Sequence, residues 1–237
     1  MQFFVIGLGE IDMPTPNPNP NQRPYPSLAV TGVLIGIVVL GMIWGLQWLL
    51  TMDDPVEIKR LIEDDGPVQM VGQTCIALAF VGSLLFAIFD KQRRSSFLPL
   101  SYLLMFYTLR EADYHYKVSE YAKASQIKRF YLHELIPLST KLFMGSISVL
   151  LLVVLYRYLK QERAGYFVAL RACYPWAILM FCWAGVFVTS QIIDQLPMLH
   201  NVTGQVFEEI FESSAEVIAL MALIVFGLQL RANSKVG

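Results

Sequence analysis

Six apolar stretches, each close to the length that crosses a lipid bilayer, dominate this chain of 237 residues. A transmembrane α-helix needs about 20 residues to span the hydrocarbon core. The stretches lie at about 27–52, 68–89, 96–116, 142–159, 171–193 and 206–230. None alternates like a β-strand, and lipid offers the backbone no hydrogen-bonding partner, so each is expected to be helical. The sequence predicts an all-α fold, a polytopic membrane helical bundle of about six transmembrane helices.

The composition supports a membrane environment. Hydrophobic residues make up 55% of the chain and charged residues 16%, with a mean hydropathy of +0.51, outside the usual range of soluble domains. The net charge of −1 creates no basic field, so we expect no nucleic-acid partner. Cys75, Cys173 and Cys182 fall within the predicted spans without C-x-x-C spacing, and we interpret them as small buried hydrophobic residues.

The chain divides into one membrane domain and two short flanks. Residues 1–26 form a proline-rich N-terminal lead-in, with six prolines among residues 12–26, which disfavours regular structure. Residues 27–231 are predicted to form a single six-helix membrane domain, and residues 232–237 a short tail.

Lysine and arginine in the short loops indicate the orientation, because they favour the cytoplasmic side. The second connection, the fourth connection and the C-terminal tail are basic, whereas the fifth connection, DQLPMLHNVTGQ, has neither residue. The third connection disagrees, since it carries several lysines between Lys117 and Lys141. The balance predicts that both termini lie in the cytoplasm.

The last predicted span begins with a stripe of glutamates. At about 100° per residue, Glu208, Glu209, Glu212 and Glu216 share roughly a quarter of the helix circumference. Glu216 lies roughly 22 Å from the far end of the span, inside the hydrocarbon zone. An ionised carboxylate at that depth costs about 2.5–3.5 kcal/mol unless it is paired, protonated or hydrated. The stripe is therefore expected to face a polar partner or a ligand.

The third predicted span ends in the polar run L-R-E-A-D-Y-H-Y-K, residues 109–117. If the helix continues, Glu111 and His115 are i,i+4 neighbours on one face, and Asp113 points about 200° away. If the chain is extended, all three point the same way. Arg110 is a natural counter-ion for a glutamate of the last span, and we assign Arg110 and Glu216 to a structural ion pair.

Six spans put connections one, three and five on one side, together with the histidines of the chain. Oxygen and imidazole ligands from several helices suit a divalent metal such as Zn, Mn or Fe. No complete H-E-x-x-H motif is present, since His133-Glu134 is followed by L-I-P-L. The candidate metal ligands are His115, His200, Glu208 and Glu212; the candidate catalytic residues are Glu111, Asp113 and Glu212; the further candidates are Asp194, His133 and Glu209.

Simpler interpretations compete with a site. Glu208 and Glu209 also fit a solvated first helical turn, where acids complement the helix dipole. Arg110 and Glu111 also fit an ion pair that locks two helices. His200, which follows Pro197 in a short loop, also fits a turn residue.

The run L-R-E-A-D-Y-H, followed by I-K-R-F-Y and P-L-S-T-K-L, resembles a group of bacterial inner-membrane proteins of unknown function. That group shares an L-R-E-x-D-x-H segment, a basic-aromatic element and a last helix beginning with glutamates. The resemblance covers roughly residues 100–230 and implies a location in the bacterial inner membrane. It links the following residues in one pattern and implies no activity: Arg110, Glu111, Asp113, His115, Lys128 and Glu208 to Glu216.

Three functions fit these observations. The first is a metal-dependent membrane hydrolase that acts on a lipid or lipid-linked substrate at the outer leaflet. The second is a transporter or ion pathway, because acids inside a membrane commonly mark proton or cation routes. The third is an accessory subunit of a larger membrane complex, with partner membrane subunits docked on the polar cluster. The lipid bilayer is the expected surrounding in each case.

Overall fold

The computed structural model describes residues 28–62, 66–111, 127–132, 134, 136–199 and 201–234. Across these ranges every regular element is helical and no strand occurs, which confirms the all-α prediction. The helices are α1 (Leu28–Leu50), α2 (Pro55–Ile62), α3 (Pro67–Phe89), α4 (Arg94–Glu111), α6 (Ile127–Leu132), α7 (Leu138–Arg171), α8 (Pro175–Gln195), the 3-10 helix η2 (Pro197–Leu199) and α9 (Val202–Ser234).

Five stretches are long and apolar enough to cross a membrane, so the chain is a polytopic membrane helical bundle. They are α1, the stretch Pro55–Phe89 that contains α3, α7, α8 and the part of α9 over Val202–Leu230. The third predicted span corresponds to α4, which packs along α3 as the sixth long helix. The apolar part of α4 is short, because the charged residues Arg94 and Arg110 at its two ends lie only about 24 Å apart along the helix axis. Residues 112–116 of that prediction lie outside the described ranges.

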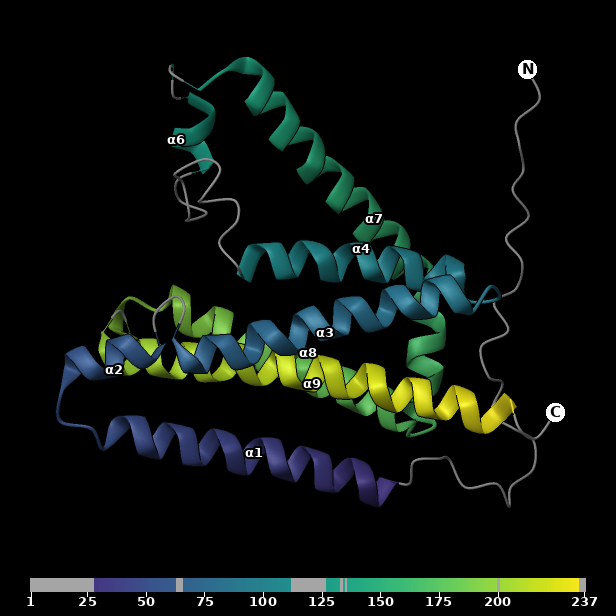
Figure 1. The fold of residues 1–237 in the computed structure, drawn as a ribbon, viewed down its shortest axis with the longest axis horizontal. Coiled ribbons are helices and arrows are strands. Elements are labelled where there is room, and N and C mark those ends of the chain that lie inside the picture. The colour runs from purple at the N-terminus through teal and green to yellow at the C-terminus, as the bar shows by residue number, and fades with distance from the viewer. Residues whose placement is uncertain are drawn as a thin grey trace.

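Helix α9 is the centre of the bundle (Figure 1). Its residues take part in each of three buried clusters, with α3 and α4, with α1 and α8, and with α1 and α2. Val206 and Ala215 of α9 are fully buried. Near its C-terminal end, Phe226 packs on Phe97 of α4, which stacks on Phe86 of α3 with ring centroids 4.9 Å apart. This central position explains how a helix that begins with glutamates is held inside the bundle.

The two ends of the bundle differ in charge. Helices α1, α4 and α8 finish, and α3 and α9 begin, at the same end of the bundle (Figure 1). We call it the acidic end, after its acids Asp53, Asp54, Glu57, Asp194, Glu208, Glu209 and Glu212. The opposite end is called the basic end, after Lys91, Arg93, Arg94, Arg157, Lys160, Arg163 and Arg171.

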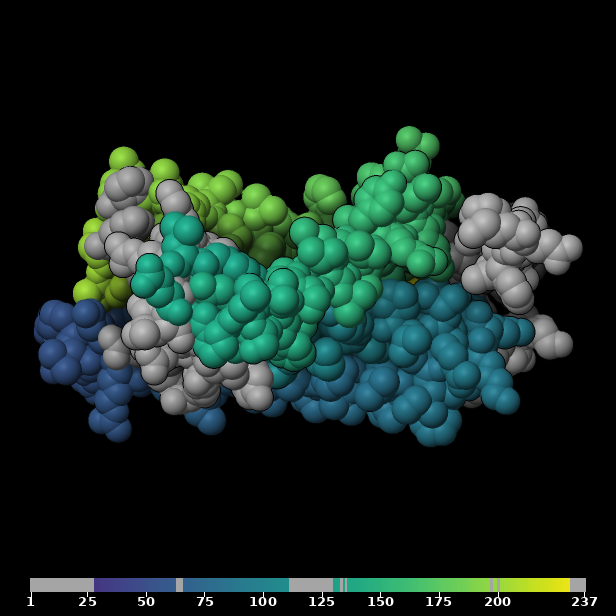
Figure 2. All heavy atoms as spheres, turned by 90° about the horizontal axis from the view of Figure 1, so that it is seen from above, coloured from purple at the N-terminus to yellow at the C-terminus, as the bar shows by residue number. Residues whose placement is uncertain are grey.

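Helix α7 diverges from the bundle toward the acidic end (Figure 1). Its main contacts are with α4 and α8, and it runs diagonally in front of the other helices when the molecule is seen from above (Figure 2). None of the residues in its apolar window is buried by other helices. Lipid is therefore the expected surrounding of most of α7.

One interpretation of the cysteines is wrong. Cys75 and Cys182 lie half-buried in α3 and α8, but Cys173 is exposed. Cys173 lies in the turn between α7 and α8 and has a φ angle of 55°, in the left-handed region. The predicted fifth span begins at Arg171, whereas α8 begins at Pro175, so the prediction placed this turn inside a helix.

Candidate functional site

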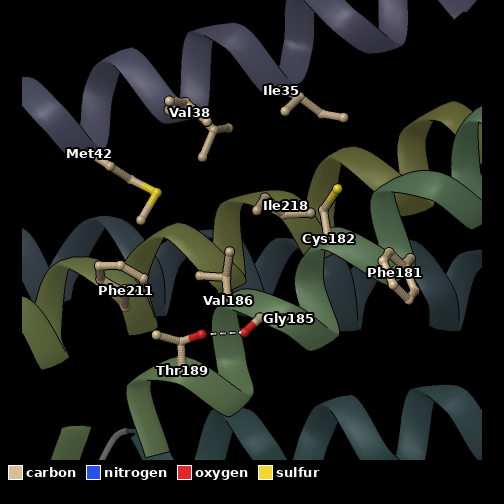
Figure 3. A pocket seen from close by; sticks show the side chains of 11 residues that line it. Ile35, Val38, Met42, Phe181, Cys182, Gly185, Val186, Thr189, Phe211 and Ile218 are labelled. Carbon is tan, nitrogen blue, oxygen red and sulfur yellow. Dashed lines mark hydrogen bonds between the residues drawn. The ribbon is translucent and has the colours of Figure 1, made fainter. Parts of the chain in front are cut away.

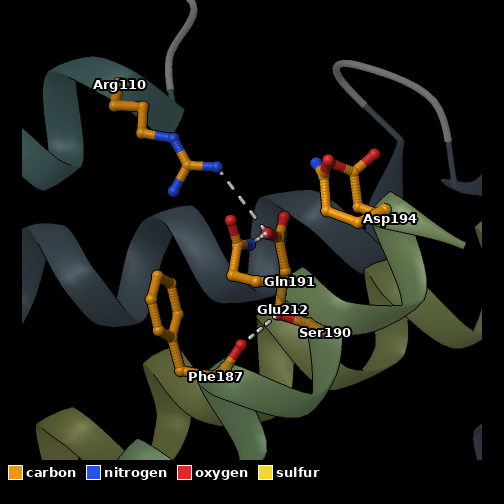
Figure 4. A network of polar contacts seen from close by, with 7 residues as sticks. Arg110, Phe187, Ser190, Gln191, Asp194 and Glu212 are labelled. Atoms are coloured by element: carbon orange, nitrogen blue, oxygen red, sulfur yellow. Dashed lines mark hydrogen bonds and ion pairs between the residues drawn. The ribbon is translucent and has the colours of Figure 1, made fainter. Parts of the chain in front are cut away.

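Three helices bring polar side chains together at the acidic end of the bundle. Arg110 lies in the last turn of α4, Gln191 near the end of α8, and Glu212 on α9. Gln191 Nε2 donates a hydrogen bond of 2.7 Å to Glu212 Oε1, and Arg110 Nη2 lies 3.7 Å from the same oxygen (Figure 4). We call Arg110, Gln191, Glu212 and the neighbouring Asp194 the Glu212 cluster.

Aromatic side chains support the cluster from the bundle interior. The Arg110 guanidinium lies 5.9 Å from the ring centroid of Tyr107, which is one turn earlier on α4. Tyr107 in turn meets Phe187 of α8 edge-on, with centroids 6.0 Å apart. Phe187 is one turn before Gln191, so both helices place an aromatic ring directly below a polar residue. The rings separate the cluster from the apolar core.

The cluster is partly open and carries more negative than positive charge. The side chain of Glu212 is 13% exposed and that of Arg110 is 43% exposed. Asp194 is exposed and accepts a hydrogen bond of 2.8 Å from Gln195. Glu208 and Glu209, half-buried on the preceding turn of α9, add two more carboxylates. Four carboxylates, those of Asp194, Glu208, Glu209 and Glu212, thus lie in the same part of the bundle as the Arg110 guanidinium.

Glu216 lies one turn deeper on α9 and is turned toward α3. Its side chain is buried, with an exposed fraction of 2%, and its carboxylate is in close contact with the backbone at Gly72. Beside it, Ser213 Oγ donates a hydrogen bond of 3.0 Å to the carbonyl of Val68. The stripe of glutamates thus faces α8 and α4 at Glu212 and α3 at Glu216.

The structure describes some of the predicted site residues and not others. Glu208, Glu209, Glu212 and Glu216 lie on α9, Asp194 lies at the end of α8, and Glu111 is the last residue of α4. The ion pair that the structure shows for Arg110 is with Glu212, whereas the sequence pattern favoured Glu216. The following candidates lie outside the described ranges: Asp113, His115, His133 and His200.

The described residues alone do not form a metal site. In the described parts of the chain, no group of three His, Cys, Asp or Glu side chains is placed to hold a metal ion. One oxygen of Glu212 already accepts from Gln191 and faces Arg110. Hard carboxylate oxygens suit Mn or Zn, but a complete ligand set needs the predicted histidines from connections three and five.

Two residues near the Glu212 cluster were not predicted from the sequence to belong to the site. Gln191 belongs to the polar exit of the fifth predicted span, and its position three residues before Asp194 was the available signal. Gly72 had no signal, because it is a single glycine in an apolar run and its close approach to Glu216 depends on how α3 and α9 pack.

A hollow between α1, α8 and α9 is apolar, in contrast to the Glu212 cluster. It has a volume of about 290 Å³, and its described lining carries no charged side chain. Thr189 is its main polar residue, and its hydroxyl donates to the carbonyl of Gly185 in the same helix at 2.8 Å (Figure 3). This hollow suits an apolar chain, so the Glu212 cluster is the better candidate for polar chemistry.

Comparisons with protein-family models, with curated proteins and with solved structures gave no match to this chain.

Proposed function

We propose that this chain is a multi-pass protein of the bacterial inner membrane with both termini in the cytoplasm. The charge difference between the ends of the bundle supports this orientation, because the basic end also holds the start of α1 and the end of α9. In this orientation the acidic end and the Glu212 cluster lie at the outer face.

We further propose that the Glu212 cluster belongs to a metal-dependent site that hydrolyses a lipid or lipid-linked substrate at the outer leaflet. The observation that carries this proposal is the Glu212 side chain, which Gln191 and Arg110 hold in one orientation, one turn from the carboxylates of Glu208 and Glu209. Carboxylates fixed in orientation by outer partners are typical of metal ligands.

The residues divide into holding and reacting groups. Glu208 and Glu212, with His115 and His200 from connections three and five, would hold the metal. A divalent metal supplies an activated water when bound. Glu111 or Asp113 would accept the proton of that water as general base. Arg110, still 43% exposed, would orient Glu212 and attract an anionic part of the substrate.

Metal analysis of the protein tests the proposal. We expect stoichiometric zinc, manganese or iron in the purified protein, and a loss of at least about tenfold in metal content for Glu208→Gln and for His200→Ala. Glu57→Gln is the matched control, because Glu57 is an exposed acid on α2 at the same end of the bundle. A folded protein free of metal, with the same melting temperature after metal is added, would contradict the proposal.

An ion or proton pathway is the second candidate. The burial of Glu216, one turn deeper than Glu212 on the same helix, favours it. In liposomes with an imposed pH gradient, wild-type protein is then expected to conduct protons, and Glu216→Gln to reduce the flux about tenfold or more. Glu57→Gln serves again as the control. Flux that is unchanged in both Glu212→Gln and Glu216→Gln would exclude a route along this stripe.

An accessory-subunit role is the third candidate. It is favoured by α7, whose apolar window is not buried by any other described helix. Purification from native membranes distinguishes it, because a subunit would stay with its partners, whereas a stable isolated monomer would count against this role.

A further inference from the structure

The second half of α7 carries an aromatic and basic face that the proposed function does not use. Tyr156, Leu159, Lys160 and Arg163 are spaced i, i+3, i+4 and i+7, so they share about 100° of the helix circumference. These residues line one hollow on the surface of α7. We call them the Tyr156 face.

The Tyr156 face lies where α7 leaves the hydrocarbon core. No charged residue occurs from Leu142 to Tyr156, a run of about 22 Å, whereas Arg157, Lys160 and Arg163 follow within two turns. Tyr156 and Leu159 are 66% and 54% exposed. Along α7 the apolar run is followed by a tyrosine and then by two cations. Groups follow this order where a helix passes from the hydrocarbon core to the headgroups of a bilayer.

No residue in the described part of the chain neutralises the positive charges of the face. Within the described residues, Lys160 and Arg163 make no hydrogen bond or ion pair. Glu162 is next in sequence, but it points about 100° from Arg163 and about 160° from Lys160 around the helix. At the same end of the bundle, Asp90 is already paired with Arg93 at 3.0 Å. The face therefore presents two cations that no described side chain pairs with.

We infer that the Tyr156 face binds the headgroup of an anionic phospholipid, with the acyl chains lying along the apolar part of α7. The charge complementarity selects this occupant, because a phosphodiester accepts hydrogen bonds from Lys160 Nζ and the Arg163 guanidinium at the depth where lipid phosphates lie. The Tyr156 hydroxyl adds a third donor, and Leu159 contacts the start of the chains. The inference does not depend on the function of the Glu212 cluster.

Lipid retention on the full chain tests this inference. The protein is reconstituted in nanodiscs of phosphatidylcholine with and without phosphatidylglycerol, and the retained lipids are identified by native mass spectrometry. We expect wild-type protein to retain phosphatidylglycerol about tenfold more strongly than phosphatidylcholine. Lys160→Gln with Arg163→Gln is expected to abolish that preference, and Lys160→Gln alone to reduce it by roughly threefold.

Lys59→Gln with Arg60→Gln is the matched control. It removes the same charge from two exposed residues of α2 at the acidic end, so the preference for phosphatidylglycerol should be unchanged. Equal retention of both lipids by wild-type protein would overturn the inference. So would a preference that persists in the double variant of the Tyr156 face, or one that the α2 control loses to the same extent.

Discussion

Gly72→Ala is expected to lower the free energy of unfolding by about 1–3 kcal/mol, the usual cost of overpacking a filled interior. A Cβ at this position would collide with Glu216 Oε2 and would lie 3.0 Å from Ser213 Cα, which belongs to the backbone of α9. Because a backbone atom cannot rotate away, α3 and α9 would have to separate. Thermal unfolding of the purified protein in detergent measures the loss.

Gly32→Ala is the control for the glycine effect, since a Cβ at Gly32 meets nothing within 4 Å. It should leave the melting temperature unchanged or raise it slightly, because alanine favours helix. The cost of Gly72→Ala should also be smaller in a Glu216→Ala background, where the colliding carboxylate is gone and only the Ser213 contact remains. An unchanged melting temperature for Gly72→Ala would show that α3 and α9 do not pack this closely.

The sequence predicted most of the helices because apolar length alone defines a membrane span. It underestimated α7, which was expected to end near residue 159 but continues to Arg171. The charges at Arg157, Lys160 and Arg163 end the apolar run without ending the helix. Gly165 and Ala169, farther along, are buried and keep this polar extension packed on its neighbours. The length of an apolar run indicates which residues cross the membrane, whereas the residue at which a helix ends depends on local packing.

The site was predicted at the right end of the bundle but with an incomplete set of contacts. Loop alternation brought Arg110, Asp194 and the glutamates of α9 to the same end, as the structure shows. Helical periodicity gives the direction of a side chain around the helix axis, and the directions of Glu212 and Glu216 differ by only about 40°. Which of them reaches Arg110 depends on how far α4 slides along α9, and that offset results from packing between helices that no local pattern reports.

Arg110→Met is expected to lower the free energy of unfolding by about 2 kcal/mol, less than the 3–5 kcal/mol for a fully buried ion pair because Arg110 is 43% exposed. The variant leaves Glu212, which is 13% exposed, with the hydrogen bond from Gln191 but without the guanidinium of Arg110. In a Glu212→Gln background the same change should cost about 0.5 kcal/mol or less, since no buried charge is left behind. Unfolding of the four proteins of this double-mutant cycle gives the coupling.

Arg157→Met is the matched control, because Arg157 is exposed and makes no described ion pair, so it should show no coupling to Glu212→Gln. Equal losses for Arg110→Met in both backgrounds would mean that the two side chains act independently.

The same cycle also bears on the proposed metal site. If Glu212 helps to hold a divalent cation, added Zn²⁺ or Mn²⁺ should restore the stability of Arg110→Met, because the cation replaces the guanidinium as the neighbouring positive charge. Restoration that also occurs in the Glu212→Gln background would place the cation elsewhere. A variant that no metal restores would leave the Arg110–Glu212 pair as a structural link between α4 and α9.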